Sequence, residues 1–180
     1  MYITKLALLV AALRASTISA APSPEKTSDD FDEVAVRSYD LRTAIDRMAI
    51  LGHDASSVHD LFSDFAGLVD GLSEINKANV DGNVEAFDEQ EQEETCRSIN
   101  ATRYSQAVII RMLGDKADRI KQFPLSPSIG RLIHPYQKEI TKFLDEVNSR
   151  LDNCDDKYKK RLEGAIKTAR AQYAAIDPEA

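Results

Sequence analysis

The stretch from Val58 to Ile75 constrains the fold of this chain most, because its apolar residues recur at alternating intervals of three and four positions. This spacing places all of them on one face of an α-helix, whereas a strand would need alternation at every second residue. A long helix with one apolar face must bury that face against other elements, so the pattern predicts a helical bundle. The residues on the face are Val58, Leu61, Phe65, Leu68, Leu72 and Ile75.

Similar but less regular patterns predict four further helices. Their expected ranges are 32–51, 88 to about 122, 129–151, and from a cap at Asn153 or Asp155 to about 173. Pro135 falls inside the third of these ranges, where it predicts a kink or a short helix followed by the main one. No convincing alternation of period two occurs in the chain, so we expect an all-α antiparallel bundle of four or five helices.

Local signals mark where two of these helices begin. Asp88 and Glu91 have the spacing of a capping box, and the glutamates that follow suit a helix N-terminus. Asp54 or Ser56 is placed to cap the helix that starts before Val58. Between these two helices we expect a polar connection over residues 76–87.

The first 20 residues have the three parts of a secretory signal peptide. Lys5 supplies a basic start, residues 6–13 form a short apolar run, and Ile18-Ser19-Ala20 presents small residues for cleavage. The apolar run is too short to cross a bilayer of about 30 Å. We therefore expect a signal peptide over 1–20, a flexible arm over 21–30 and a bundle domain over 31–176. The expected location is extracellular or cell-wall associated.

The chain carries a formal net charge of −7, and removal of residues 1–20 would make it more negative. Nucleic acids and anionic membranes would repel such a surface, so neither is an expected partner. Nothing after residue 13 resembles a membrane-spanning run.

The sequence contains no nucleophile elbow, no phosphate-binding loop and no HExxH motif, and we expect neither an enzyme nor a cofactor. His53 and His59 are six residues apart, which places their imidazoles on different helix faces. Lys77 would take the first ligand position of a calcium loop around residues 79–82. No metal site is expected.

Cys96 and Cys154 are the only two cysteines, and in an oxidising compartment they are expected to form a disulfide. The helix from residue 96 to 120 rises about 36 Å and the next helix returns about 33 Å, which brings the two cysteines to the same end of the bundle.

Asn100-Ala-Thr102 is an acceptor sequence for N-glycosylation. Because Asn100 follows the inward-facing Ile99, we expect it to be accessible and glycosylated.

Gly67 and Gly71 form a G-x-x-x-G motif within the helix that carries the regular apolar face. Each glycine in a helix interior costs about 1 kcal/mol relative to alanine. Two explanations stay open. The glycines are simply tolerated at the surface, or the missing side chains let a neighbouring helix approach or leave space for a ligand.

The helical pattern of the chain resembles the fungal family of hydrophobic surface-binding proteins and cell-wall galactomannoproteins. The resemblance covers residues 34–175 and is most specific in Lys121-Gln-Phe123, in the turn 125–129, in spaced apolar positions such as Ile140, and in the Ala-rich helix 161–173. It implies a secreted helical domain that adsorbs to hydrophobic surfaces and, in some members, holds a fatty acid between helices. This chain is richer in charge than that pattern.

We therefore expect a secreted, non-enzymatic protein that binds an apolar ligand or a hydrophobic surface. The alternative is a secreted effector that binds a host protein. The expected ligand wall lies between the helix of Val58–Ile75 and the helix interrupted by Pro135, although the same residues could instead fill one another completely. The candidate wall is Phe65, Leu68, Leu72, Tyr136, Ile140 and Phe143.

Overall fold

In the computed structural model, the described residues are 23–51, 54–79 and 87–176. Every regular element in these ranges is an α-helix, which confirms the all-α prediction. The expected signal peptide lies outside the described residues, as do His53 and residues 80–86. The helices are α2 (Pro24–Leu51), α3 (Ala55–Ala78), α4 (Glu89–Ile120), α5 (Ser126–Asn148) and α6 (Lys159–Ala174).

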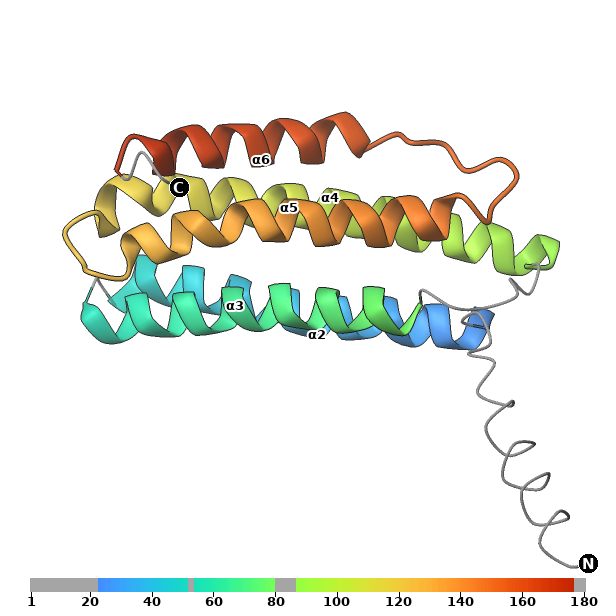
Figure 1. The fold of residues 1–180 in the computed structure, drawn as a ribbon, viewed down its shortest axis with the longest axis horizontal. Coiled ribbons are helices and arrows are strands. Elements are labelled where there is room, and N and C mark those ends of the chain that lie inside the picture. Colours follow the sequence, from blue (N-terminus) through green and yellow to red (C-terminus); the bar gives the residue numbers. More distant parts are fainter. Residues whose placement is uncertain (1–22, 52–53, 80–86, 177–180) are drawn as a thin grey trace, which may run out of the picture.

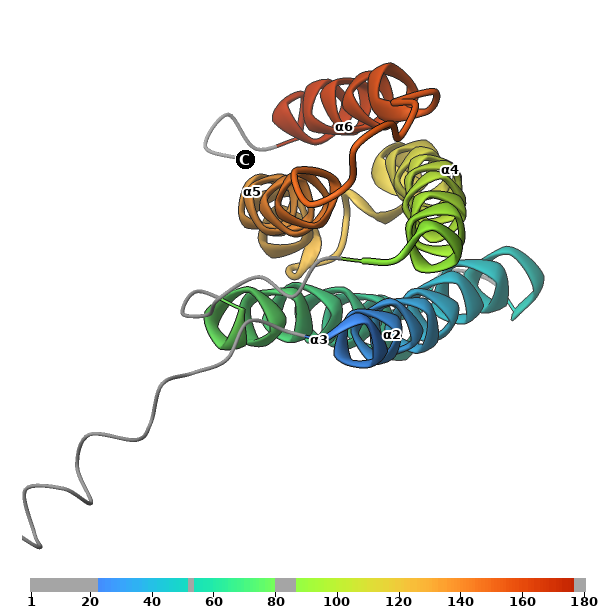
Figure 2. The same ribbon diagram turned by 90° about the vertical axis from the view of Figure 1, so that its right-hand side faces the viewer.

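The helices lie in three tiers (Figures 1 and 2). Helices α2 and α3 form an antiparallel hairpin, and α4 and α5 form a second layer above it, with α4 over α2 and α5 over α3. Helix α6 covers α4 and α5 on the side opposite the hairpin. The second layer is therefore covered on both sides, which explains why α4 and α5 contribute many core residues.

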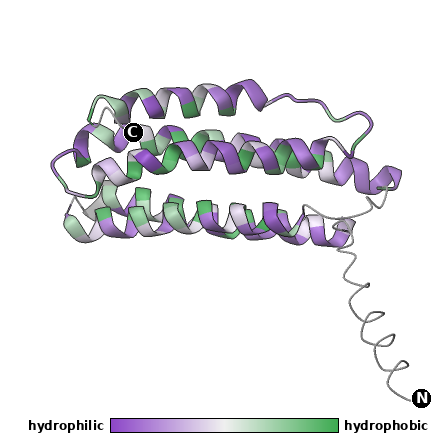
Figure 3. Ribbon diagram, in the orientation of Figure 1, coloured by the Kyte–Doolittle hydropathy of each residue, from purple (hydrophilic) through white to green (hydrophobic). Residues whose placement is uncertain are grey.

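The apolar face predicted for residues 58–75 is buried in α3, where each of its six side chains is at most 3% exposed. Helix α5 supplies the facing side chains, and its ribbon alternates between apolar and hydrophilic residues in Figure 3. Such amphipathic helices fold because burial of one face removes apolar area from water. No described helix has an apolar stretch long enough to cross a membrane.

Two helices begin with the capping boxes that their sequences indicate. At α4, the Glu91 N–H donates to Asp88 Oδ1 and the Asp88 N–H donates to Glu91 Oε2, both at 2.8 Å. At α3, Asp54 rather than Ser56 is the cap, and its carboxylate accepts hydrogen bonds from the hydroxyl and N–H of Ser57. These two bonds lower the pKa of Asp54.

Residues 24–30, which we expected to be part of a flexible arm, instead form the first two turns of α2. The Lys26 N–H donates to Ser23 Oγ at 3.2 Å, and Pro24 occupies the first helical turn, where its missing N–H is tolerated. Farther along the helix, the Phe31 ring contacts Phe143 of α5 with centroids 5.0 Å apart. Polar composition suggested an arm, but the cap and this contact stabilise a helix.

Two predicted boundaries near the C-terminus also differ from the structure. Of the two outcomes expected at Pro135, a short helix followed by the main one does not occur, because α5 runs unbroken from Ser126 to Asn148. Ile133 and Tyr136 on either side of the proline are both fully buried, so the apolar face continues through it. Helix α6 begins only at Lys159, after a connection that contains Cys154. Neither Asn153 nor Asp155 caps it.

Candidate functional site

The six residues proposed as a ligand wall meet at the contact between α3 and α5. Each is at most 1% exposed. The rings of Phe65 and Tyr136 pack in a tilted arrangement with centroids 5.6 Å apart. The wall therefore joins the hairpin to the second layer. Its α3 members are Phe65, Leu68 and Leu72, and its α5 members are Tyr136, Ile140 and Phe143.

The wall is closed in this structure. None of the five depressions characterised in the described part of the molecule is lined by any of its six residues. An apolar ligand at this place would take over contacts that the two helices now make with each other. Binding here thus requires the helices to separate or the side chains to move.

A buried polar chain runs beside the wall and links three helices. The Tyr136 hydroxyl donates to Gln106 Oε1 of α4 at 2.9 Å, and burial raises the pKa of this tyrosine. The Gln106 amide in turn donates to Ser38 Oγ of α2, and the Ser38 hydroxyl donates to the backbone oxygen of Val34. Ser38 and Gln106 were missed in the sequence because a buried polar residue carries no signal until its partner helix is known. The only sequence signal for these two residues is that each lies on a helix face that is otherwise apolar.

A second polar contact crosses the same boundary near the end of α3. The Asn76 amide donates to the backbone oxygen of Glu139 at 2.9 Å and to its carboxylate at 2.8 Å. Asn76 is 1% exposed. Such directional bonds fix the register of α3 on α5, which apolar contacts alone specify less strictly.

The G-x-x-x-G motif of α3 faces Arg37 of α2. Arg37 Nη1 donates to the backbone oxygen of Gly67 at 2.8 Å, and its guanidinium pairs with Glu33 at 2.8 Å. The arginine side chain occupies the space that a side chain at position 71 would need. Of the two explanations left open by the sequence, close approach of a neighbouring helix is the one that applies at Gly71.

Arg103 of α4 is almost wholly buried and holds the C-terminal part of the bundle together. Its guanidinium pairs with Asp156 in the connection after α5, and it lies 3.5 Å from Asp145 of α5. Lys159 at the start of α6 also pairs with Asp145, at 3.1 Å. Both carboxylates are about half exposed, so only the arginine is removed from water.

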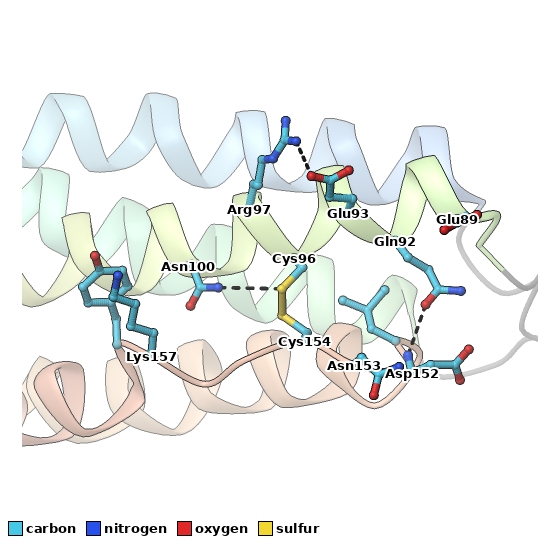
Figure 4. A pocket seen from close by; sticks show the side chains of 12 residues that line it. Glu89, Gln92, Glu93, Cys96, Arg97, Asn100, Asp152, Asn153, Cys154 and Lys157 are labelled. Atoms are coloured by element: carbon cyan, nitrogen blue, oxygen red, sulfur yellow. Dashed lines mark hydrogen bonds and ion pairs between the residues drawn. A yellow bond between two sulfur atoms is a disulfide. The ribbon is translucent and has the colours of Figure 1, made fainter.

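The predicted disulfide joins Cys96 of α4 to Cys154, with Cα atoms 5.4 Å apart. It forms the floor of an open depression of about 820 Å³ between the first turns of α4 and residues 151–158 (Figure 4). Asn100, the predicted glycosylation acceptor, lines this depression and is half-buried. Within the described residues, no group of three or more His, Cys, Asp or Glu side chains is placed to hold a metal ion.

The fold and its single covalent link define a helical bundle with one disulfide. None of the family models, curated proteins or solved structures compared with the chain matches it. The resemblance to hydrophobic surface-binding proteins therefore stays a prediction from the sequence.

Proposed function

We propose that this protein is a secreted, non-catalytic protein that binds apolar surfaces or fatty-acid-like lipids through the wall between α3 and α5. The observation that supports the proposal is the position of this wall relative to the disulfide. The disulfide closes a loop of 58 residues that contains most of α4 and all of α5. The hairpin of α2 and α3 lies outside that loop, although half of the wall belongs to it.

The hairpin can therefore leave the second layer as a unit without breaking a covalent bond. In water this separation is unfavourable, because each large apolar side chain of the wall loses about 1.5–3 kcal/mol of burial free energy. An apolar surface or an acyl chain replaces the lost contacts. The open form is then favoured only where such a partner is present, since a ligand shifts an equilibrium by its differential affinity for the two states.

Polar contacts across the boundary hold the closed form in register. The Gln106 amide, which is 1% exposed, has its Ser38 partner only while α2 lies against α4. In the open form, water satisfies the same amide. These contacts add stability to the closed form without adding affinity for an apolar partner.

The test measures displacement of a fluorescent fatty acid and adsorption to alkyl-coated beads with the full secreted chain. Ser38→Ala leaves the Gln106 amide without its partner in the closed form only, a loss of about 1–2 kcal/mol. If binding requires separation, the apparent affinity tightens by about 5–30-fold. Ser98→Ala is the matched control, because the Ser98 hydroxyl also bonds to a backbone oxygen four residues earlier, that of Glu94, but not across the layers.

Saturable binding that Ser38→Ala does not tighten would place the site on another surface. If neither the native protein nor the variant binds the fatty acid or the beads, the proposal is wrong. The alternative function, binding of a host protein, would then be the favoured one.

A further inference from the structure

The depression over the disulfide has the chemical character of a carbohydrate site. Its volume of about 820 Å³ lies in the range of ligand sites. The Asp152 N–H donates to Gln92 Oε1 at 3.2 Å, and the Glu93–Arg97 pair lies along the opposite side. Tyr158 lines one end, where it also contacts the ring of Tyr104 with centroids 5.4 Å apart. Hydroxyl groups of a sugar find acceptors and donors here, and an aromatic ring offers a surface for its apolar face.

Asn100, the predicted acceptor of a glycan, is one of the residues that line this depression. Its Oδ1 atom is buried and has no hydrogen-bond partner among the described residues. Its Nδ2 atom makes one weak contact, 3.7 Å from Cys96 Sγ, and Figure 4 shows the amide pointing toward the sulfur atoms. The atom to which an N-linked glycan attaches, Nδ2, therefore lies beside the disulfide.

We propose that Asn100 carries a glycan linked through Nδ2, and that its first N-acetylglucosamine docks in the depression, against Tyr158 and over the disulfide. In the transfer, Asn100 Nδ2 attacks C1 of a lipid-linked oligosaccharide supplied by the secretory pathway. The new bond is Nδ2–C1, the C1–oxygen bond to the lipid pyrophosphate breaks, and Nδ2 gives up one proton to a base of the transferase. Because Asn100 is half-buried in the folded chain, the transfer precedes the closing of this region.

This inference shares with the proposed function only the passage through the secretory pathway, because none of the wall residues lines the depression and the ligand chemistry is different. It predicts that the glycan shields the disulfide from solution. A sugar held over the sulfur atoms blocks a thiolate, which must approach a disulfide sulfur directly in order to exchange with it. A glycan that pointed into solvent would not.

The experiment uses the full chain secreted from a eukaryotic host and follows reduction of Cys96–Cys154 by dithiothreitol, with alkylation and mass spectrometry. Four samples are compared: the native glycoprotein, the same protein trimmed enzymatically to one N-acetylglucosamine, Thr102→Ser, which keeps the acceptor sequence, and Thr102→Ala, which removes it. We expect the first three to be reduced at similar rates and Thr102→Ala about 3–10-fold faster. Circular dichroism verifies that both variants fold.

Tyr158→Ala separates docking from simple bulk. In the glycosylated protein it removes the protection, whereas in the Thr102→Ala background it changes the rate little, as a double-mutant cycle requires. The proposal is overturned if Asn100 carries no glycan, if glycosylated and unglycosylated chains are reduced at the same rate, or if the protection survives Tyr158→Ala.

Discussion

At Gly71 the identity of a single residue is set by a side chain from another helix. A Cβ atom there would lie 2.7 Å from Cζ of Arg37, closer than real side chains approach one another. At Gly67 the nearest atom to a Cβ is Arg37 Nη1, at 4.0 Å, which is ordinary contact. Two glycines four residues apart in one motif therefore have different reasons to be present.

Alanine substitution should distinguish the two positions. Gly67→Ala gains helix propensity without a clash and should stabilise the protein by about 0.5–1 kcal/mol. Gly71→Ala gains the same propensity but displaces Arg37 from Gly67 and Glu33, and we expect a net destabilisation of about 1 kcal/mol. Urea unfolding of both variants measures the difference. Equal stabilisation by the two would show that Arg37 moves without loss.

The residues predicted from the sequence share one property, which is that a local pattern reveals them. Phe65 and Leu72 follow the period of a helix, and Asp88 has its capping partner three residues away. The residues that were missed, Arg37 and Gln106 among them, are polar groups whose hydrogen bonds depend on a partner about 30 to 70 residues distant. No local pattern contains such a partner, so the apolar wall was predictable and the polar contacts beside it were not.

At the scale of the elements, the buried side chain of Arg103 links separate parts of the bundle. It reaches from α4 to α5 and to the connection before α6. Its two carboxylate partners keep about half of their contact with water. The attraction between the charges therefore does little more than offset the free energy lost when the guanidinium is removed from water. The long side chain, in contrast, fills space between three elements.

Substitutions at Arg103 should separate the two contributions. Arg103→Met keeps most of the volume, and we expect its free energy of unfolding to stay within about 1 kcal/mol of the native value. Arg103→Ala leaves a cavity as well and should destabilise by about 2–4 kcal/mol. Thermal and urea unfolding of both variants measure these free energies. A large loss in both variants would mean that the ion pairs themselves stabilise the contact.

At the scale of the molecule, the disulfide divides the bundle into two parts with different covalent constraints. A cross-link over 58 residues stabilises by about 4 kcal/mol in the chain-entropy model, because it restricts the unfolded chain. Separation of the α2–α3 hairpin leaves the loop closed before and after. The disulfide thus opposes complete unfolding but has no direct effect on the opening of the hairpin.

Native-state hydrogen exchange should show this difference. In the oxidised protein, amides of α2 and α3 should exchange through a partial opening of lower free energy than the global unfolding that exposes α4 and α5. In Cys96→Ala/Cys154→Ala, the free energy of global exchange should fall by up to about 4 kcal/mol, while that of the hairpin opening should stay unchanged until the two coincide. Ser38→Ala should instead lower the free energies of hairpin opening and of global exchange by the same amount, because it removes a native bond that is broken in both. A single free energy shared by all the helices described above in the oxidised protein would contradict this scheme, and with it the separation on which the proposed binding mode depends.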